Sequence, residues 1–204
     1  SLTGFVKSRP DLEIPDIQFH FSAGNLMSIQ RKPFAKKATD HTRPDAFMAH
    51  ACQLRPDSRG EITLRSADAA MPPVIQPNYL SAESDRLTMR AAFKVARNVM
   101  SQPALAAFSN GEVWPGPDIQ ADDEIDSFIA EAAGTVYHPV STCRMGADAA
   151  AVVDGELRVR GVQGLRVVDA SIMPSLVGGN TNAPTIMIAE KASDMILGQA
   201  PATA

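Results

Sequence analysis

The sequence has few cysteines, few histidines and no surplus of positive charge, and each scarcity excludes a class of protein. Cys52 and Cys143 are the only two cysteines and form no CxxC pair, so at most one disulfide could form and a reducing compartment is expected. The four histidines lack the HxxxH and HExxH spacings of a dedicated metal site. A net charge of -4 argues against a phosphate-binding groove, and therefore against nucleic acid as a partner.

No stretch has the composition of a membrane span or of a targeting peptide. The uncharged run from Ala170 to Ala189 contains prolines, glycines and asparagines, which would leave unsatisfied backbone groups in a bilayer. We therefore expect this run to be soluble and buried. The first residues, SLTGFVKSRP, have no initiator Met and none of the regions of a signal peptide. We expect the chain to start within a longer protein.

The composition, with 45% apolar and 21% charged residues among 204, suits one core and a small second lobe. Alternation in DIQFHFS predicts a half-buried strand that places Ile17, Phe19 and Phe21 on one face. Residues 46–54 and 61–66 flank a turn at 55–60 and predict a hairpin of central strands. The basic segment 28–45 is typical of a solvated loop, and a lid near an active-site mouth is the alternative.

Apolar residues at helical spacing predict three helices. They are expected from an N-cap at Ser81 to just before Pro103, from an N-cap at Asp122 to Gly134, and from near Pro184 to Gly198. The third is apolar on all sides in its first half, which predicts burial. Short strands at 156–160 and 165–168 are expected before it. These elements predict an α+β fold, with a mostly antiparallel sheet and helices on one face.

Two segments contain residue types that core packing does not require. The first is YHPVSTCRMG, residues 137–146, in which His138 precedes the conformationally fixed Pro139. Imidazole suits proton transfer near neutral pH, so His138 is either a general base or a hydrogen-bonded core histidine. Cys143 has no activating histidine in this segment and is best interpreted as a small buried hydrophobe.

The second segment is DASIMPSLVGGNTNAPT, residues 169–185, which leads into the last helix. The backbone N–H groups at a helix N-terminus are unpaired and can hold developing negative charge. Asn180 and Asn182 add hydrogen-bonding groups beside the two glycines. The alternative is an ordinary helix start, with asparagines as turn and cap residues.

In this order and spacing, the two segments resemble the C-terminal signature of the glucose-methanol-choline (GMC) family of flavin-dependent oxidoreductases. Upstream, PDIQFHF, LRPDSRGEITLRSADAAMPPVIQPNYLS and RAAFKVARNVMSQPAL are similar to the family's substrate-binding region. The resemblance implies a substrate-binding domain in residues 1–135. It also implies that residues 136–204 supply an active-site histidine and a helix of the FAD-binding lobe. Ser141 departs from the family, which usually has glycine there.

The resemblance also implies the chemistry, which is oxidation of a primary alcohol by FAD. In the family a histidine acts as the base toward the alcohol. The corresponding residue here is His138, and its partner falls on Asn180. The substrate could be choline-like, aliphatic or aromatic. Val136 and Tyr137 are expected to wall the substrate pocket. The expected FAD contacts are Asp169, Ala170, Thr181, Asn182 and Thr185.

The chain contains no GxGxxG turn, which family members use to bind the ADP half of FAD. We therefore expect the N-terminal FAD-binding part of the same protein to be the partner of this chain. Alone, the chain should neither hold FAD tightly nor turn over. A cytoplasmic location is expected, with peripheral attachment to the inner membrane left open. The alternative function is a stand-alone, non-catalytic module that binds a small molecule or a partner.

Overall fold

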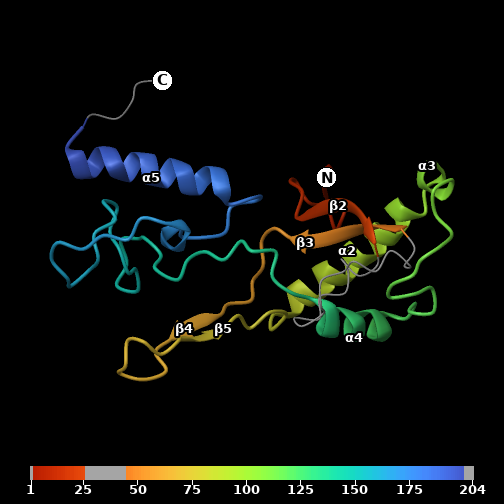
Figure 1. Cartoon of the computed structure of the whole chain (residues 1–204), viewed down its shortest axis with the longest axis horizontal. Helices are drawn as coiled ribbons and strands as arrows, with labels where there is room; N and C mark the ends of the chain where they lie inside the picture. Colours follow the sequence, from red (N-terminus) through yellow and green to blue (C-terminus); the bar gives the residue numbers. More distant parts are fainter. Residues whose placement is uncertain (1, 26–44, 200–204) are drawn as a thin grey trace. The chain divides into compact units, whose positions relative to one another are not determined.

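The computed structural model describes residues 2–25 and 45–199 (Figure 1). The predicted loop or lid at 28–45 therefore lies, apart from its last residue, outside the described residues. The chain forms two compact units. Unit 1 consists of Ser1–Asp57 and Leu80–Ala133, and unit 2 of Ser58–Tyr79 and Gly134–Ala204. The expected functional boundary between residues 135 and 136 stays a prediction.

Unit 1 contains a three-stranded antiparallel sheet in the order β1-β2-β3. Its strands are β1 (Leu2–Val6), β2 (Ile17–Asn25) and β3 (Asp45–Gln53). The strand predicted at DIQFHFS is confirmed as part of β2. Ile17 and Phe19 are buried on the face that packs against Ala92. Gln18, on the opposite face, is fully buried as well, so the expectation of a half-buried strand is wrong at this position. Its Nε2 donates to Thr3 Oγ1 at 3.1 Å across the strand pair.

The first two predicted helices are confirmed as α2 (Glu83–Met100) and α4 (Asp122–Ala132). A short helix, α3 (Pro103–Ala106), lies between them. The caps differ by one residue from expectation, because Ala82 and Ala121 hold the N-cap positions rather than Ser81 and Asp122. Glu124 supplies the missing polar partner for α4, since its Oε2 accepts from the N–H of Ala121 at 2.9 Å.

The predicted hairpin across residues 46–66 is wrong. β3 pairs with β2 along its whole length, while β4 (Glu61–Thr63) pairs with β5 (Val74–Gln76) in a separate sheet. β3 is also an edge strand, because β2 holds the centre. The segment after β3 does not close a turn, since the N–H of Asp57 donates to Asp85 Oδ1 at 2.8 Å. Alternation reveals which face a strand buries but not which strand it pairs with.

Unit 2 has little regular structure beyond the β4–β5 pair, the 3-10 helix η1 (Ala170–Ile172) and α5 (Asn182–Leu197). The strands predicted at 156–160 and 165–168 are reduced to single bridges, Val153 to Val159 and Arg158 to Arg166. Left-handed Gly161 and Gly164 turn the chain sharply between them. Its core is a cluster of six buried residues: Val153, Leu157, Ile172, Met173, Ile188 and Ala192.

The third predicted helix is confirmed as α5, which begins after Thr181 and ends at the left-handed Gly198. Its expected burial is wrong for this chain. Ile188 and Ala192 face the core, but Ile186 and Met187 are 54% and 56% exposed. The helix lies on the core by one side only, so its opposite apolar side has no cover within the described residues. Among those residues, no helix combines the length and apolarity needed to span a bilayer.

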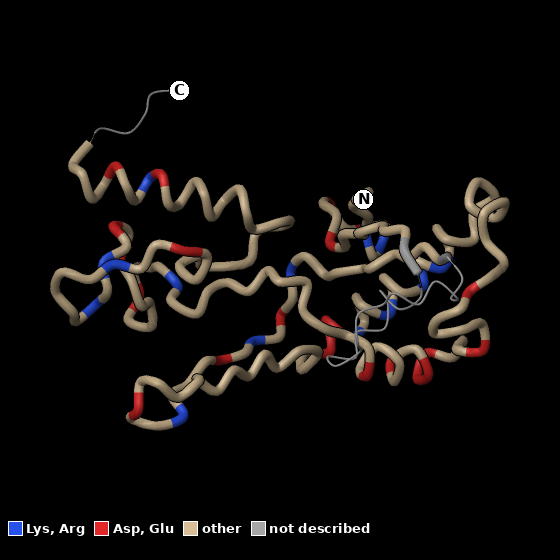
Figure 2. Tube along the Cα trace, in the orientation of Figure 1, with Lys and Arg blue, Asp and Glu red and all other residues tan. Residues whose placement is uncertain are grey.

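An ion-pair network joins α2 to α4, and several positions along α4 are coloured as acidic residues in Figure 2. Arg90 Nε donates to Asp126 Oδ1 at 2.7 Å, and Arg90 Nη1 donates to Asp122 Oδ2 at 3.0 Å. Lys94 also donates to Asp122. The hydrogen bond from Arg90 lowers the pKa of Asp126 below the ordinary carboxyl value.

This network predicts a dependence of stability on pH. Because folding lowers the pKa of Asp126, its contribution is present above the ordinary carboxyl pKa of about 4 and is lost as the pH falls through the folded value. We expect Asp126→Asn to unfold at a lower temperature than the native protein at pH 7, and the difference to shrink at pH 3. Thermal unfolding between pH 3 and 7 measures this. Asp118→Asn is the control, and equal behaviour of both variants would contradict the prediction.

Candidate active site

The side chains of His138 and Asn180 meet within unit 2. Asn180 Nδ2 lies 3.4 Å from His138 Nε2, although the two residues are 42 positions apart. An amide nitrogen can only donate, so a hydrogen bond here makes Nε2 the acceptor and places the ring proton on Nδ1. His138 is half-buried and Asn180 is exposed. The arrangement places an imidazole nitrogen beside an amide, where it could take a proton.

Backbone hydrogen bonds join the two segments that carry this pair. The N–H of Cys143 donates to the Ser171 oxygen at 3.0 Å, and the N–H of Met145 donates to the Ile172 oxygen at 2.8 Å. Ile172 is itself buried in the unit 2 core. The residues after His138 and those before Asn180 are therefore fixed to one another.

The N-terminus of α5 follows directly after Asn180. Thr181 is the N-cap, and its carbonyl accepts both the N–H of Thr185 at 3.0 Å and the Thr185 hydroxyl at 2.7 Å. Asn182 begins the helix, so its N–H has no partner in the preceding turn of the helix. The positive end of the helix dipole lies here and favours a ligand that carries or gains negative charge.

A second turn with exposed polar groups is formed by Asp169. Its Oδ1 accepts from the N–H of Ser171 at 2.7 Å, which caps η1. Asp169 is exposed and Ala170 is half-buried. Both therefore lie at a stable, accessible turn, and their predicted contact with FAD stays a prediction.

Val136 and Tyr137, which were expected to wall the substrate pocket, are both exposed, Tyr137 by 63%. They are accessible to a ligand as that expectation requires, but no ligand contact tests it. The roles of His138, Asn180 and the expected FAD contacts likewise stay predictions.

The backbone on either side of His138 is left-handed. Tyr137 has φ 66° and Ser141 has φ 71°, a conformation that costs a residue with a Cβ about 1–2 kcal/mol. The resemblance expects glycine at Ser141, and a glycine at this position would indicate a left-handed backbone. Thr135 Oγ1 accepts from the N–H of Tyr137 at 2.9 Å.

The cysteines offer no competing site. Both are free. Burial raises the pKa of the Cys52 thiol, whose sulfur lies 3.8 Å from His20 Nε2, so the protonated, weakly nucleophilic form is favoured. Within residues 2–25 and 45–199, no group of three or more His, Cys, Asp or Glu side chains is placed to hold a metal ion.

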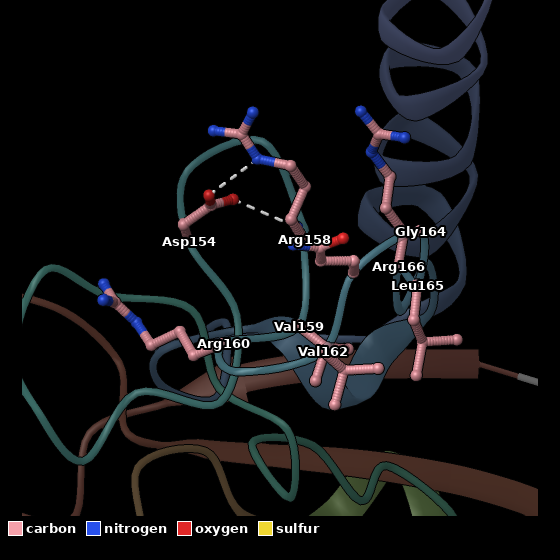
Figure 3. A pocket seen from close by; sticks show the side chains of 9 residues that line it. Asp154, Arg158, Val159, Arg160, Val162, Gly164, Leu165 and Arg166 are labelled. Atoms are coloured by element: carbon pink, nitrogen blue, oxygen red, sulfur yellow. Dashed lines mark hydrogen bonds and ion pairs between the residues drawn. The ribbon is translucent and has the colours of Figure 1, made fainter.

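A shallow hollow lined by Arg158, Arg160 and Arg166 lies on the loop between Asp154 and Arg166 (Figure 3). Its positive charge is partly neutralised, because Arg158 pairs with Asp154 at 2.9 Å and with Glu156 at 3.1 Å. The hollow includes neither His138 nor Asn180. Its carboxylate, Asp154, accepts hydrogen bonds from the backbone N–H and the side chain of Arg158, which lower its pKa and make it a poor proton acceptor.

The imidazole of His138 and the amide of Asn180 lie just before the N-terminus of α5, an arrangement of groups that could move a proton. Residues 56–189 match the model of the GMC oxidoreductase family, and the chain belongs to that family. It is 50% identical to human mitochondrial choline dehydrogenase over 96% of the chain and 32% of the relative. It is 48% identical to a Pseudomonas putida alcohol dehydrogenase [acceptor], over 95% of the chain and 34% of the relative.

Solved structures agree with the family. Pyridoxine 4-oxidase from Mesorbium loti superposes with a TM-score of 0.81 at 29% identity, over 98% of this chain and 38% of that one. An Aspergillus oryzae formate oxidase variant superposes with a TM-score of 0.80 at 25% identity, over 92% and 32%. The α+β fold and the family resemblance are therefore confirmed. The chain spans about a third of the length of the relatives it matches.

The left-handed backbone at Ser141 yields a prediction about stability. Glycine adopts φ near +71° without steric cost, so Ser141→Gly should raise the free energy of unfolding by up to about 1 kcal/mol. The matched control is Ser193→Gly within α5, which should lower it by a similar amount. Denaturant unfolding measures both. A destabilised Ser141→Gly protein would show that the serine side chain compensates for its backbone conformation.

Proposed function

We propose that the chain is the C-terminal part of an FAD-dependent oxidoreductase that oxidises a primary alcohol to an aldehyde. The observation that carries the proposal is the 3.4 Å contact between His138 Nε2 and Asn180 Nδ2. Membership of the GMC oxidoreductase family and similarity to choline and alcohol dehydrogenases support it. The substrate class is a primary alcohol, which can be choline-like, aliphatic or aromatic.

In this proposal His138 is the base. Its Nε2 takes the proton of the substrate hydroxyl, which makes the carbon a better hydride donor. Asn180 lies beside the same nitrogen, so its amide can donate a hydrogen bond to the developing alkoxide. Val136 and Tyr137 precede the base and, being exposed, would contact the alcohol. The alcohol would become an aldehyde by giving one proton to His138 and one hydride to FAD, which would supply the acceptor.

The residues on both sides of Asn180 carry groups suited to binding a flavin. FAD, when bound, supplies an acceptor for the hydride at N5 and gains negative charge near N1 and C2=O. The N-terminus of α5, at Thr181 and Asn182, presents backbone N–H groups suited to that charge. Asp169 and Ala170 form an accessible turn, which we assign to the ribityl and pyrophosphate part. Thr185, one turn into α5, is a further contact.

The other part of the cofactor site would come from the N-terminal, FAD-binding part of the same protein. The chain has no GxGxxG turn and spans about a third of the relatives' length. Ile186 and Met187 leave an apolar side of α5 exposed, and an apolar surface on a helix gains free energy when a neighbouring lobe covers it. We assign that cover to the FAD-binding part.

His138→Ala tests the proposed base. In the longer protein carrying FAD, kcat for a primary alcohol should fall by about 10²–10⁴, because proton removal loses its acceptor. Asn180→Ala should lower it by about 10² through loss of one donor to the alkoxide. Anaerobic bleaching of the flavin by the alcohol measures both rates.

Asn98→Ala, on the exposed side of α2, is the matched control and should bleach at the native rate. Two results would contradict the proposal. One is full activity of the His138→Ala protein, and the other is failure of every primary alcohol to bleach the native flavin.

The 204-residue chain alone is expected to bind FAD weakly and to show no turnover, because only one side of the cofactor site is present. Its exposed apolar side on α5 should also promote aggregation. Flavin fluorescence quenching and light scattering measure these properties, before and after addition of the FAD-binding part. Tight flavin binding by the chain alone would contradict the division of the site. A chain that folds and binds a small molecule without any flavoprotein partner would favour the non-catalytic alternative.

A further inference from the structure

The contact between His138 and Asn180 occupies the atom of the base that the reaction needs. Asn180 Nδ2 lies 3.4 Å from His138 Nε2. An uncharged imidazole has a lone pair on one ring nitrogen only. When the amide donates to Nε2, it therefore uses the lone pair with which Nε2 would take the proton of an alcohol. The amide and the hydroxyl of the alcohol thus compete for the same acceptor.

Transfer of the proton reverses the role of Nε2. A protonated Nε2 is a hydrogen-bond donor, and the amide nitrogen of Asn180 is a donor as well. The two atoms can then no longer share a hydrogen bond, so the amide N–H must bind another acceptor. The oxygen that has just lost its proton lies beside Nε2 at that moment. It is a strong acceptor, because hydrogen bonds to ionised groups are roughly twice as strong as those between neutral groups.

Asn180, rather than His138, is the partner whose side chain has room to move. Asn180 is exposed, and at the preceding Gly179 an added Cβ would meet no atom of a non-adjacent residue within 4 Å. Exposed side chains change rotamer within nanoseconds. His138 is half-buried, and Pro139 restricts its backbone to extended conformations. A change in the contact therefore falls on the amide.

We propose that the amide of Asn180 exchanges hydrogen-bond partners during the reaction. In the resting site it donates to His138 Nε2, and the hydroxyl of the alcohol displaces it from that nitrogen. It donates to the alkoxide oxygen once the proton has moved to Nε2. Its bond to the substrate strengthens only as negative charge develops, so it lowers the barrier without tightening the binding of the alcohol. The inference rests on the proposed function, in which His138 takes the proton of the alcohol.

The first test uses the longer, FAD-containing enzyme and a primary alcohol that bleaches its flavin. Anaerobic stopped-flow measurements at increasing alcohol concentration give the limiting rate of bleaching and the Kd of the alcohol separately. Asn180→Ala should lower the limiting rate about 10²-fold. The Kd should fall or stay within about threefold of the native value, because the alcohol no longer displaces the amide.

Two further variants serve as controls for this measurement. Asn180→Leu fills a similar space without a donor, so it should lower the limiting rate without raising the Kd more than about threefold. Asn98→Ala, on the exposed side of α2, should change neither quantity. Flavin content measured by absorbance should be equal in all four proteins.

The second test needs no variant. Crystal structures of the native enzyme, without ligand and with 2,2,2-trifluoroethanol as a poorly reactive alcohol, should differ at Nε2. The amide nitrogen should lie within about 3.5 Å of Nε2 in the first, and the hydroxyl should take its place in the second.

The inference is overturned if Asn180→Ala raises the Kd of the alcohol more than about threefold, because the amide would then bind the alcohol before the proton moves. It is also overturned if the amide stays on Nε2 beside a bound hydroxyl. Failure of the proposed function is recognised separately, by a His138→Ala enzyme that remains fully active.

Discussion

Two backbone hydrogen bonds are the constraint on which the candidate site depends. Through them Cys143 and Met145 are joined to Ser171 and Ile172, and these bonds connect segments that are far apart in the sequence. Ile172 and Met173 hold these two hydrogen bonds in place, because both residues are buried in the unit 2 core. Two groups that act on one substrate must be held to within about half an ångström of their productive positions. Without these two bonds, no interaction between neighbours in the sequence would bring His138 to Asn180.

His138, the proposed base, lies on an irregular segment rather than on a helix or strand, so other features must fix its position. The ring of Pro139 fixes its own φ. The left-handed residues Tyr137 and Ser141 change the direction of the chain sharply on either side of it. Backbone strain of this kind persists only where surrounding contacts hold it, and it gathers at functional sites. Asn180, in contrast, is followed at once by α5, whose N-cap determines where it lies.

Unit 1 shows how a single buried carboxylate organises a crossing of the chain. Asp85 is buried near the start of α2, where its Oδ1 accepts from Gln53 Nε2 at 2.9 Å and from the N–H of Asp57 at 2.8 Å. It thereby ties the end of β3 and the following residues to the helix. The chain leaves unit 1 after Asp57 and returns at Leu80. A buried carboxylate with satisfied oxygens can maintain such a crossing, because breaking its bonds would leave a charge without partners.

The helices and the family were predictable from the sequence, because helical periodicity, caps and short motifs are local properties. The strand pairing was not. The pattern at 46–54 and 61–66 described two strands but could not reveal that β2, rather than the neighbouring run, pairs with β3, since pairing is decided by contacts between distant residues. The same limit holds for the apolar side of α5, which periodicity marked as buried although this chain leaves Ile186 and Met187 exposed. At the site, the residue types of His138 and Asn180 came from the sequence. Their contact exists only once tertiary packing has brought the two segments together.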